Sequence, residues 1–276
     1  MNRKLATSEE IARRFVRTIA PTSIFRIVAN SVDTAYGAAE MGIGPYLKFR
    51  SLFPKSYPDP RSQPGLVRTF HFSSLRHPIL ARPWTTDMFG IQSVCIRKSY
   101  AAKLPESDVR LIIDAGANIG DTTVWYLSTF PNAIVYAVEP NPENFDLLVK
   151  NCEPYGTRAR AIKAALWNKH CRLTLDDSPR NDAFVVTEDP CGPCDAISPS
   201  DILRDSGQRS IDVLKCDIEG SEALLFAENY EWLNTTQYIC IEIHNADCMR
   251  AVMSAVRGCG FTAQPTKFRE LHIFCK

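Results

Sequence analysis

The stretch IIDAGANIGDT, residues 112–122, decides the fold. It begins in an apolar run that is typical of a buried strand, and it leads into a segment, residues 122–130, with the pattern of a helix. Gly116 and Gly120 allow a tight turn in which the backbone approaches a ligand closely. A strand, a glycine-containing turn and a helix in this order predict the first unit of an α/β sheet with a ligand site at the turn.

The same stretch also indicates the charge of the ligand. Its Gly-x-Asn-x-Gly spacing differs from the Gly-x-Gly-x-x-Gly of a pyrophosphate-binding turn, and it lacks the Lys of a Walker loop. Asp114 stands two residues before the first glycine. A carboxylate there would repel a pyrophosphate and attract an α-amino group or a sulfonium. We therefore predict a cationic ligand.

Strands and helices alternate along the chain from about residue 105, which predicts a doubly wound, mostly parallel sheet of the α/β class. Ligands of such sheets bind at the carboxyl ends of the strands. The predicted strands are 109–114, 133–138, 160–165, 211–216 and 238–243, the predicted helices are 122–130, 142–152, 221–227 and 246–257, and hairpins are predicted at 171–175 with 183–186 and at 260–263 with 271–274.

Glu139 ends the second predicted strand, 25 residues after Asp114. An acid at this position can accept hydrogen bonds from ribose hydroxyls, in a nicotinamide dinucleotide or in an adenosyl ligand. Together the two acids favour S-adenosylmethionine, with its amino end at Asp114 and its ribose at Glu139. The alternative is a pair of helix-capping acids.

The first hundred residues differ from the rest in charge and pattern. They hold 15 Lys/Arg and 6 Asp/Glu, whereas the remaining 176 hold 17 and 25. One short helix is predicted before Pro21, and six prolines between Phe53 and Pro83 predict an extended path. We predict a helical and irregular extension over residues 1–104, covering the acceptor site, and a ligand-binding domain over residues 105–276. A basic partner-binding arm is the alternative.

Composition excludes several classes of protein. Apolar residues make up 45% of the chain, which is enough for a core, and no stretch reaches the ~18 apolar residues of a membrane span. The first residues are basic, but acidic residues follow where a signal peptide has its apolar region, so no signal peptide is expected. The sequence has no run of consecutive Lys or Arg residues, so nucleic-acid binding is not expected. Ten scattered cysteines predict reduced thiols and a cytoplasmic protein. Cys191 and Cys194 are predicted to lie in a surface loop, with zinc or redox chemistry as alternatives.

A series of motifs in one order resembles the FkbM family of S-adenosylmethionine-dependent methyltransferases. The series covers about residues 105–276 and departs from the family at Cys216, where the family usually has an aliphatic residue. Its motifs are DAGANIGDT from Asp114, VEPNPEN from Val138, ALWN from Ala165, LKCDIEGSE from Leu214 and IEIH from Ile241. The resemblance implies a seven-stranded, Rossmann-like class I methyltransferase fold. It also implies methyl transfer from S-adenosylmethionine, most often to a hydroxyl of a sugar or natural product, with S-adenosylhomocysteine as the second product.

The resemblance also implies the residues of the cofactor site. A weaker match upstream, at Thr86 and Asp87, is similar to a short family motif that helps to close the cofactor pocket. The residues assigned to cofactor binding are Thr86, Asp87, Asp114, Gly116, Ala117, Asn118, Gly120, Asp121, Thr122, Glu139, Asn141, Asn144, Ala165 and Asp217.

Polar side chains are expected at the carboxyl ends of the later strands, at Asp217, Glu219, Glu242 and His244. An alcohol acceptor must lose a proton, so we predict His244 as the base, Glu219 as the second choice, and Glu242 on the same strand face as His244. These groups could instead hold a divalent metal, but no tight ligand spacing requires one, and we predict none.

The predicted function is O-methylation of a small molecule. N-methylation of an amide or amine, a nicotinamide-dependent dehydrogenase, and a binding module without catalysis are the alternatives. The sequence leaves the identity of the acceptor and the oligomeric state open.

Overall fold

The computed structural model describes residues 22–101, 108–176, 185–266, 268 and 271–276. The chain divides into two compact units, Met1–Ser51 and Leu52–Lys276. The helix predicted before Pro21 and the boundary predicted near residues 103–106 lie outside the described residues. The assignment of residues 1–104 to one domain stays a prediction.

From residue 22 on, the first unit forms the helices α2 (Thr22–Met41) and α3 (Ile43–Ser51), which were not predicted from the sequence. Gly42 has a φ of +83° and separates them. Tyr46 and Phe49 of α3 are buried. A Cβ atom on Gly37 of α2 would lie 2.1 Å from the ring of Tyr46, so the absence of a side chain allows α3 to pack against α2.

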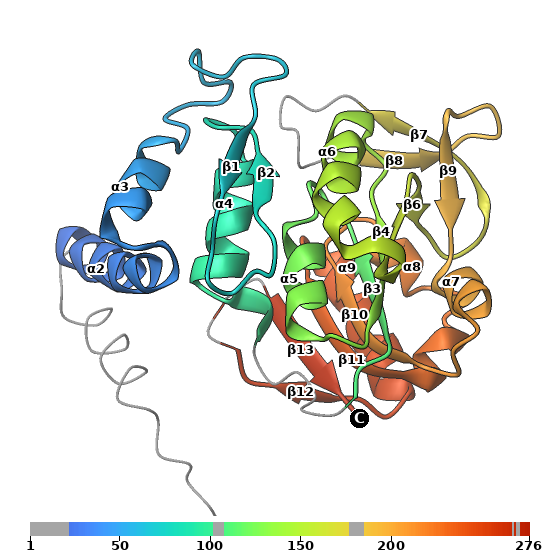
Figure 1. Ribbon diagram of the computed structural model, residues 1–276. Coiled ribbons are helices and arrows are strands. Elements are labelled where there is room, and N and C mark those ends of the chain that lie inside the picture. Colours follow the sequence, from blue (N-terminus) through green and yellow to red (C-terminus); the bar gives the residue numbers. More distant parts are fainter. Residues whose placement is uncertain (1–21, 102–107, 177–184, 267, 269–270) are drawn as a thin grey trace, which may run out of the picture. The chain divides into compact units, whose positions relative to one another are not determined.

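The second unit is built on a seven-stranded sheet with the order β12-β13-β11-β10-β3-β4-β5 (Figure 1). Only β13 runs against its neighbours, β11 and β12, and the other pairs are parallel. This confirms the predicted doubly wound, mostly parallel sheet. The strands are β3 (Leu111–Ala115), β4 (Ile134–Val138), β5 (Ala159–Ile162), β10 (Ile211–Cys216), β11 (Thr236–Glu242), β12 (Thr262–Gln264) and β13 (Leu271–Cys275).

Helices bury both faces of this sheet. Leu111 and Ile113 of β3 share a core cluster with Val252 of α9, whereas Ala137 of β4 packs with Leu148 of α6 in another. The helices of this part are α5 (Asp121–Thr129), α6 (Pro142–Cys152), η3 (Glu153–Arg158), α7 (Pro199–Ser206), α8 (Glu222–Leu225), η4 (Glu231–Thr235) and α9 (Ala246–Gly258). No helix among the described residues is long and apolar enough to cross a membrane.

A second, four-stranded sheet has the order β6-β9-β7-β8. Its antiparallel pair β7 (Cys171–Asp176) and β8 (Val185–Glu188) confirms the predicted hairpin. The third predicted strand is divided between the two sheets, because β5 ends at Ile162 and β6 (Ala165–Leu166) pairs with β9 (Cys194–Ile197).

Helix α7 was not predicted from the sequence. Pro199 is the first residue of α7, where a missing N–H costs nothing. The Ser198 side chain caps the helix by accepting the N–H of Asp201, and the Asp201 carboxylate accepts the N–H of Ser198.

Residues 53–83, for which the prolines predicted an extended path, contain no helix, but many of them form turns and bends and few are in strands. The segment between the first unit and β3 forms the antiparallel pair β1 (Arg68–Phe70) and β2 (Ile79–Ala81), followed by the short helices α4 (Asp87–Ile91), η1 (Gln92–Ile96) and η2 (Ser99–Ala101). Asn151 of α6 fastens it: its amide accepts the N–H of Leu80 at 2.7 Å and donates to the carbonyl oxygens of Leu80 and Ile119 at 2.9 and 2.8 Å.

Replacement of Asn151 by Ala leaves buried backbone groups of β2 and of the loop before α5 without partners. We expect Asn151→Ala to lower the free energy of unfolding by about 2 kcal/mol or more, measured by urea titration. The matched control is Asn132→Ala at an exposed position. An equal, small loss in both variants would show that Asn151 does not hold the segment.

Candidate active site

A cavity of about 280 Å³ lies at the carboxyl edge of the sheet, where the strand order reverses between β3 and β10. Its wall comes from the turns after β3, β4 and β10, from β6, from the end of β11 and from residues between 86 and 100, all within the second unit. Eleven of the predicted site residues line it: Thr86, Gly116, Asn118, Asp121, Thr122, Glu139, Asn144, Ala165, Asp217, Glu219 and Glu242.

The glycine turn after β3 packs directly on the turn after β10. Gly116 has a φ of +70°, and a Cβ atom there would lie 1.8 Å from the carbonyl oxygen of Asp217. Gly120, with a φ of +88°, precedes α5, and a Cβ atom there would lie 2.7 Å from the Leu148 side chain. Both positions therefore require glycine, for close packing as well as for backbone conformation.

Glu139 follows β4 and is almost completely buried at the cavity wall. Its two carboxylate oxygens accept the backbone N–H groups of Asn118 at 2.8 Å and Asn141 at 2.9 Å. The Asn144 side chain also hydrogen-bonds to Glu139, and the carboxylate keeps its remaining acceptor capacity for a ligand hydroxyl. Burial raises the pKa of Glu139 to about 7, although the two N–H groups oppose this shift.

Asp114 is fully buried at the end of β3 and does not line the cavity. Thr123 donates to its carboxylate at 2.6 Å, and the ammonium group of Lys215 lies 3.3 Å away. Lys215 itself lines the cavity and donates to the Gly116 carbonyl oxygen at 2.7 Å. Burial alone would lower the pKa of Lys215, but Asp114 and Asp217 hold it above its ordinary value.

The sequence analysis missed Lys215. The signal was present, because a single Lys interrupts the otherwise apolar end of the strand 211–216. The predicted contact of Asp114 with the amino end of a cofactor stays a prediction, and in the structure Lys215 is the charged partner of Asp114.

The two residues of the Thr86–Asp87 motif have different surroundings. Thr86 lines the cavity, whereas Asp87 is fully buried and pairs with Arg82 at 2.9 Å. Arg82 also donates to the Asn144 side chain at 2.6 Å. The pair therefore ties α4 to α6 beside the cavity.

Ala117, Gly120 and Asn141 do not line the cavity. Ala117 and Asn141 support it instead: the Ala117 N–H donates to the Val138 carbonyl oxygen, and the Asn141 side chain caps α6 by accepting the N–H of Asn144. Asp121, at the first residue of α5, lines the cavity, and burial raises its pKa to about 7.

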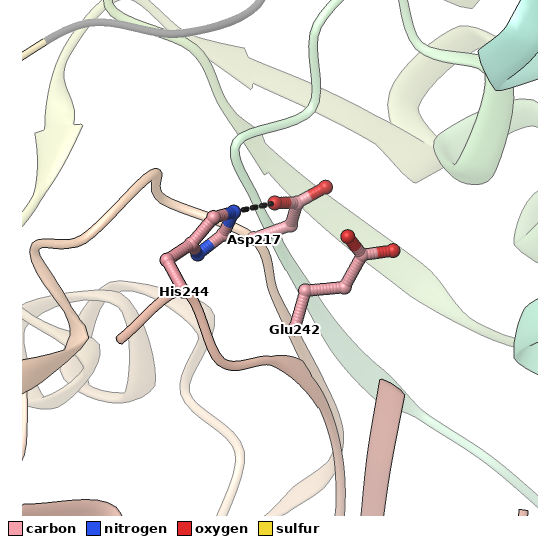
Figure 2. A group of neighbouring side chains, drawn as sticks. All are labelled: Asp217, Glu242 and His244. Carbon is pink, nitrogen blue, oxygen red and sulfur yellow. Dashed lines mark ion pairs between the residues drawn. The ribbon is translucent and has the colours of Figure 1, made fainter. Parts of the chain in front are cut away.

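The four polar residues predicted at the later strand ends do come together. Asp217 follows β10 and Glu242 ends β11, and Figure 2 shows the side chains of these two residues and of His244 close to one another. The His244 Nε2 atom lies 3.6 Å from Asp217 and 3.4 Å from Glu219. Asp217, Glu242 and His244 each offer one possible metal-ligand atom within 4.8 Å of the others. The prediction of no metal stays a prediction.

His244 carries carboxylates on both sides of its ring. Its Nδ1 atom lies 2.8 Å from Glu222, a fully buried residue that the sequence analysis missed. The hydrogen bond with Glu222, helped by the charges of Asp217 and Glu219, raises the pKa of His244 to about 9. Below this pH the ring is an imidazolium, which cannot accept a proton. His244 also lies outside the cavity wall.

Glu242 has the environment of a titrating acid. It lines the cavity, and the Tyr100 hydroxyl donates to its carboxylate at 3.1 Å. Burial, together with the charge of Asp217, raises the pKa of Glu242 to about 7. A carboxylate with this pKa is half deprotonated near neutral pH, where a general base is most effective.

Cys191 lies in the turn after β8, but Cys194 is the first residue of β9, so the predicted surface loop is wrong for Cys194. Cys191 is exposed and Cys194 is buried, and burial raises the pKa of the Cys194 thiol. All ten cysteines are free thiols.

Comparison with known proteins agrees with this geometry. The Methyltransferase FkbM domain matches residues 114–262. The chain is similar to the hexuronic acid methyltransferase AglP of Haloferax volcanii, at 28% identity over 160 residues, 57% of this chain and 64% of that protein. The match therefore spans less than two thirds of that protein.

Two solved structures are similar at a lower level. The precorrin-6y C5,15-methyltransferase of Geobacter metallireducens GS-15 has 12% identity and a TM-score of 0.43, with 66% of this chain and 87% of that chain covered. Aeropyrum pernix fibrillarin, with natively bound S-adenosyl-L-methionine, has 13% identity and a TM-score of 0.42, with 78% and 84% covered.

The family match covers more than half of the chain, and it begins at the first acid of the glycine turn and includes the carboxyl ends of β10 and β11. The chain therefore belongs to the FkbM family of S-adenosylmethionine-dependent methyltransferases.

Proposed function

We propose that the protein transfers the methyl group of S-adenosylmethionine to a hydroxyl oxygen of a sugar. The observation that carries this proposal is the joint presence of Glu139 and Glu242 in one cavity. One can hold ribose hydroxyls, and the other can receive the proton of an alcohol. The similarity to a protein named as a hexuronic acid methyltransferase supports a sugar acceptor.

The cofactor site in this proposal consists of the glycine turn, Glu139 and the residues around Asp121. When bound, S-adenosylmethionine supplies the methyl group on a sulfonium, and its positive charge suits a cavity wall that contains Asp121, Asp217 and Glu242. Glu139 would bind the ribose. Asp114 would act on the site through Lys215, whose ammonium group fixes the carbonyl oxygen of Gly116.

The proton of the acceptor would pass to Glu242. This assignment differs from the base predicted from the sequence, because His244 is charged near neutral pH and lies outside the cavity wall. His244 and Glu219 would instead set the charge around Asp217, and Tyr100 would hold Glu242 in place. The enzyme's main task remains the alignment of acceptor oxygen and methyl carbon.

N-methylation is the second candidate that the same cofactor site permits. An amine acceptor that is protonated in solution also needs a base, so Glu242 does not separate the two reactions. The sugar named in the relative favours oxygen. A cytoplasmic location, a role in natural-product synthesis and the absence of nucleic-acid binding stay predictions.

A screen of purified protein with S-adenosylmethionine and a panel of sugars, glycosides, phenols and amines tests the proposal. The readout is S-adenosylhomocysteine production, followed by mass spectrometry and NMR of the product. We expect an O-methyl sugar. An N-methyl product, or turnover with phenols alone, would contradict the acceptor assignment.

Glu139→Gln should weaken S-adenosylmethionine binding by about 10- to 100-fold, because a hydrogen bond to a charged acceptor contributes about 1.5–3 kcal/mol. Isothermal titration measures the dissociation constant. Glu143→Gln is the matched control, since its side chain is 86% exposed on the first turn of α6. Equal affinity in both variants would exclude Glu139 as the ribose ligand.

The pH profile of methyl transfer should report Glu242. A base acts in its deprotonated form, so kcat/KM should rise with pH and reach half its maximum near pH 7, where the pKa of Glu242 lies. If His244 were the base, the rise would instead be centred near pH 9. In Glu242→Gln the rise near pH 7 should vanish and the rate should fall by about 10²–10⁴-fold. A rise near pH 9 that His244→Ala removes would restore the histidine as the base.

Removal of divalent metals should leave methyl transfer unchanged. Below about pH 9 the imidazolium of His244 places a positive charge beside Asp217 and repels a second cation. Initial rates before and after dialysis against EDTA measure this. Activity that is lost on dialysis and restored by Mg²⁺ or Mn²⁺ would show that the strand-end carboxylates hold an ion.

A further inference from the structure

Three aromatic side chains pack together, and one of them reaches the cavity: Phe53, Tyr57 and Phe89, which we call the aromatic platform. Phe89 lines the cavity and is 44% exposed, and Tyr57 is 48% exposed. The ring centroids of Phe53 and Tyr57 lie 5.0 and 6.5 Å from that of Phe89. Nothing in the methyl-transfer chemistry proposed above uses these rings.

The loop that carries two of the platform rings is held by one buried carboxylate. Asp59 accepts the backbone N–H groups of Lys55 at 2.8 Å and Arg61 at 3.0 Å, and it pairs with the Arg61 guanidinium at 2.6 Å. Arg61 also donates to the Phe53 carbonyl oxygen at 3.2 Å and lies over the Trp84 ring. An aromatic surface fixed in this way loses little freedom when a ligand packs on it.

The same cavity has an acidic wall. Asp217, Glu219 and Glu242 line it, and Lys215 is the only cationic side chain among its lining residues in the described part of the chain. That ammonium group is already paired with Asp114. The His244 imidazolium lies behind Asp217 and Glu219, but it is itself paired with Glu222. The wall is therefore net negative, so it accepts hydrogen bonds from hydroxyls and disfavours anions.

A pyranose ring matches both surfaces at once. Its C–H face packs on aromatic rings, whereas its hydroxyls donate to carboxylates at the ring edge. A carboxylate on the ring would instead add a like charge to a wall of three acids, which disfavours binding.

We infer that the aromatic platform and the strand-end carboxylates form an acceptor subsite for an uncharged hexopyranose, and that this subsite discriminates against hexuronic acids. The inference rests on the proposed sugar methylation and narrows it. The acceptor proposed here differs from the hexuronic acid in the name of the Haloferax relative.

The test measures binding of two probes, methyl glucopyranoside and methyl glucopyranosiduronic acid, to the full chain saturated with S-adenosylhomocysteine. We expect the uncharged glycoside to bind at least about 10-fold more tightly in titrations followed by NMR. Phe89→Ala and Tyr57→Ala should each weaken its binding by about 5- to 10-fold, and Phe89→Tyr, which keeps a ring, should retain it. Tyr36→Ala, at a 44% exposed aromatic residue of the first unit, is the matched control and should change nothing.

Two results would overturn the inference. One is equal or tighter binding of the uronic acid, and the other is unchanged glycoside binding in the two alanine variants. Thermal unfolding and S-adenosylhomocysteine affinity identify misfolded variants, and a folded Phe89→Ala that loses that affinity would place the platform in the cofactor site and also overturn it. Failure of the wild-type chain to bind S-adenosylhomocysteine would instead contradict the proposed function itself.

Discussion

A buried ion pair between the two central strands is the constraint on which the site depends. Asp114 of β3 and Lys215 of β10 are register partners in the parallel sheet, and both side chains are almost completely removed from water. Burying two charges is costly, and loss of either partner leaves the other uncompensated. The pair stands where the strand order reverses, and Lys215 also binds the glycine turn. Lys215 thereby helps to fix the position of that turn, together with the Val138 carbonyl oxygen, which accepts the N–H groups of Gly116 and Ala117.

Most of the sheet could be predicted because its strands are continuous apolar runs separated by turn signals. Where the prediction missed elements, the local signal was weak or ambiguous. Helix α2 carries β-branched residues and Gly37, all of which lower helix propensity. Helix α7 begins at Pro199, and the same residue type can end a helix or start one. The capping Ser198 with Asp201 was the signal that decides between these two outcomes.

The position of the candidate site could be predicted from the sequence, but the protonation states of its residues could not. Parallel strands end at one edge of a sheet, so the order of strands and polar residues along the chain was enough to group Asp217, Glu242 and His244. Their protonation could not be predicted, because it depends on burial and on partners far away in the chain. Glu222 lies 22 residues before His244 and accepts its ring N–H, and Tyr100 lies 142 residues before Glu242. The contact with Glu222 makes the histidine a cation. Burial and the charge of Asp217 raise the pKa of Glu242, whereas the Tyr100 hydroxyl opposes that rise and holds the carboxylate in place.

The close contact between the two strand-end turns has a mechanical consequence. With no room even for a methyl group between Gly116 and the backbone of Asp217, the turns after β3 and β10 cannot move closer to each other. Adaptation to ligands of different size then falls to the wall that α4, η1 and η2 contribute. Among related enzymes with different acceptors, sequence differences should accordingly be concentrated in this wall, while the turns after β3 and β10 tolerate little change.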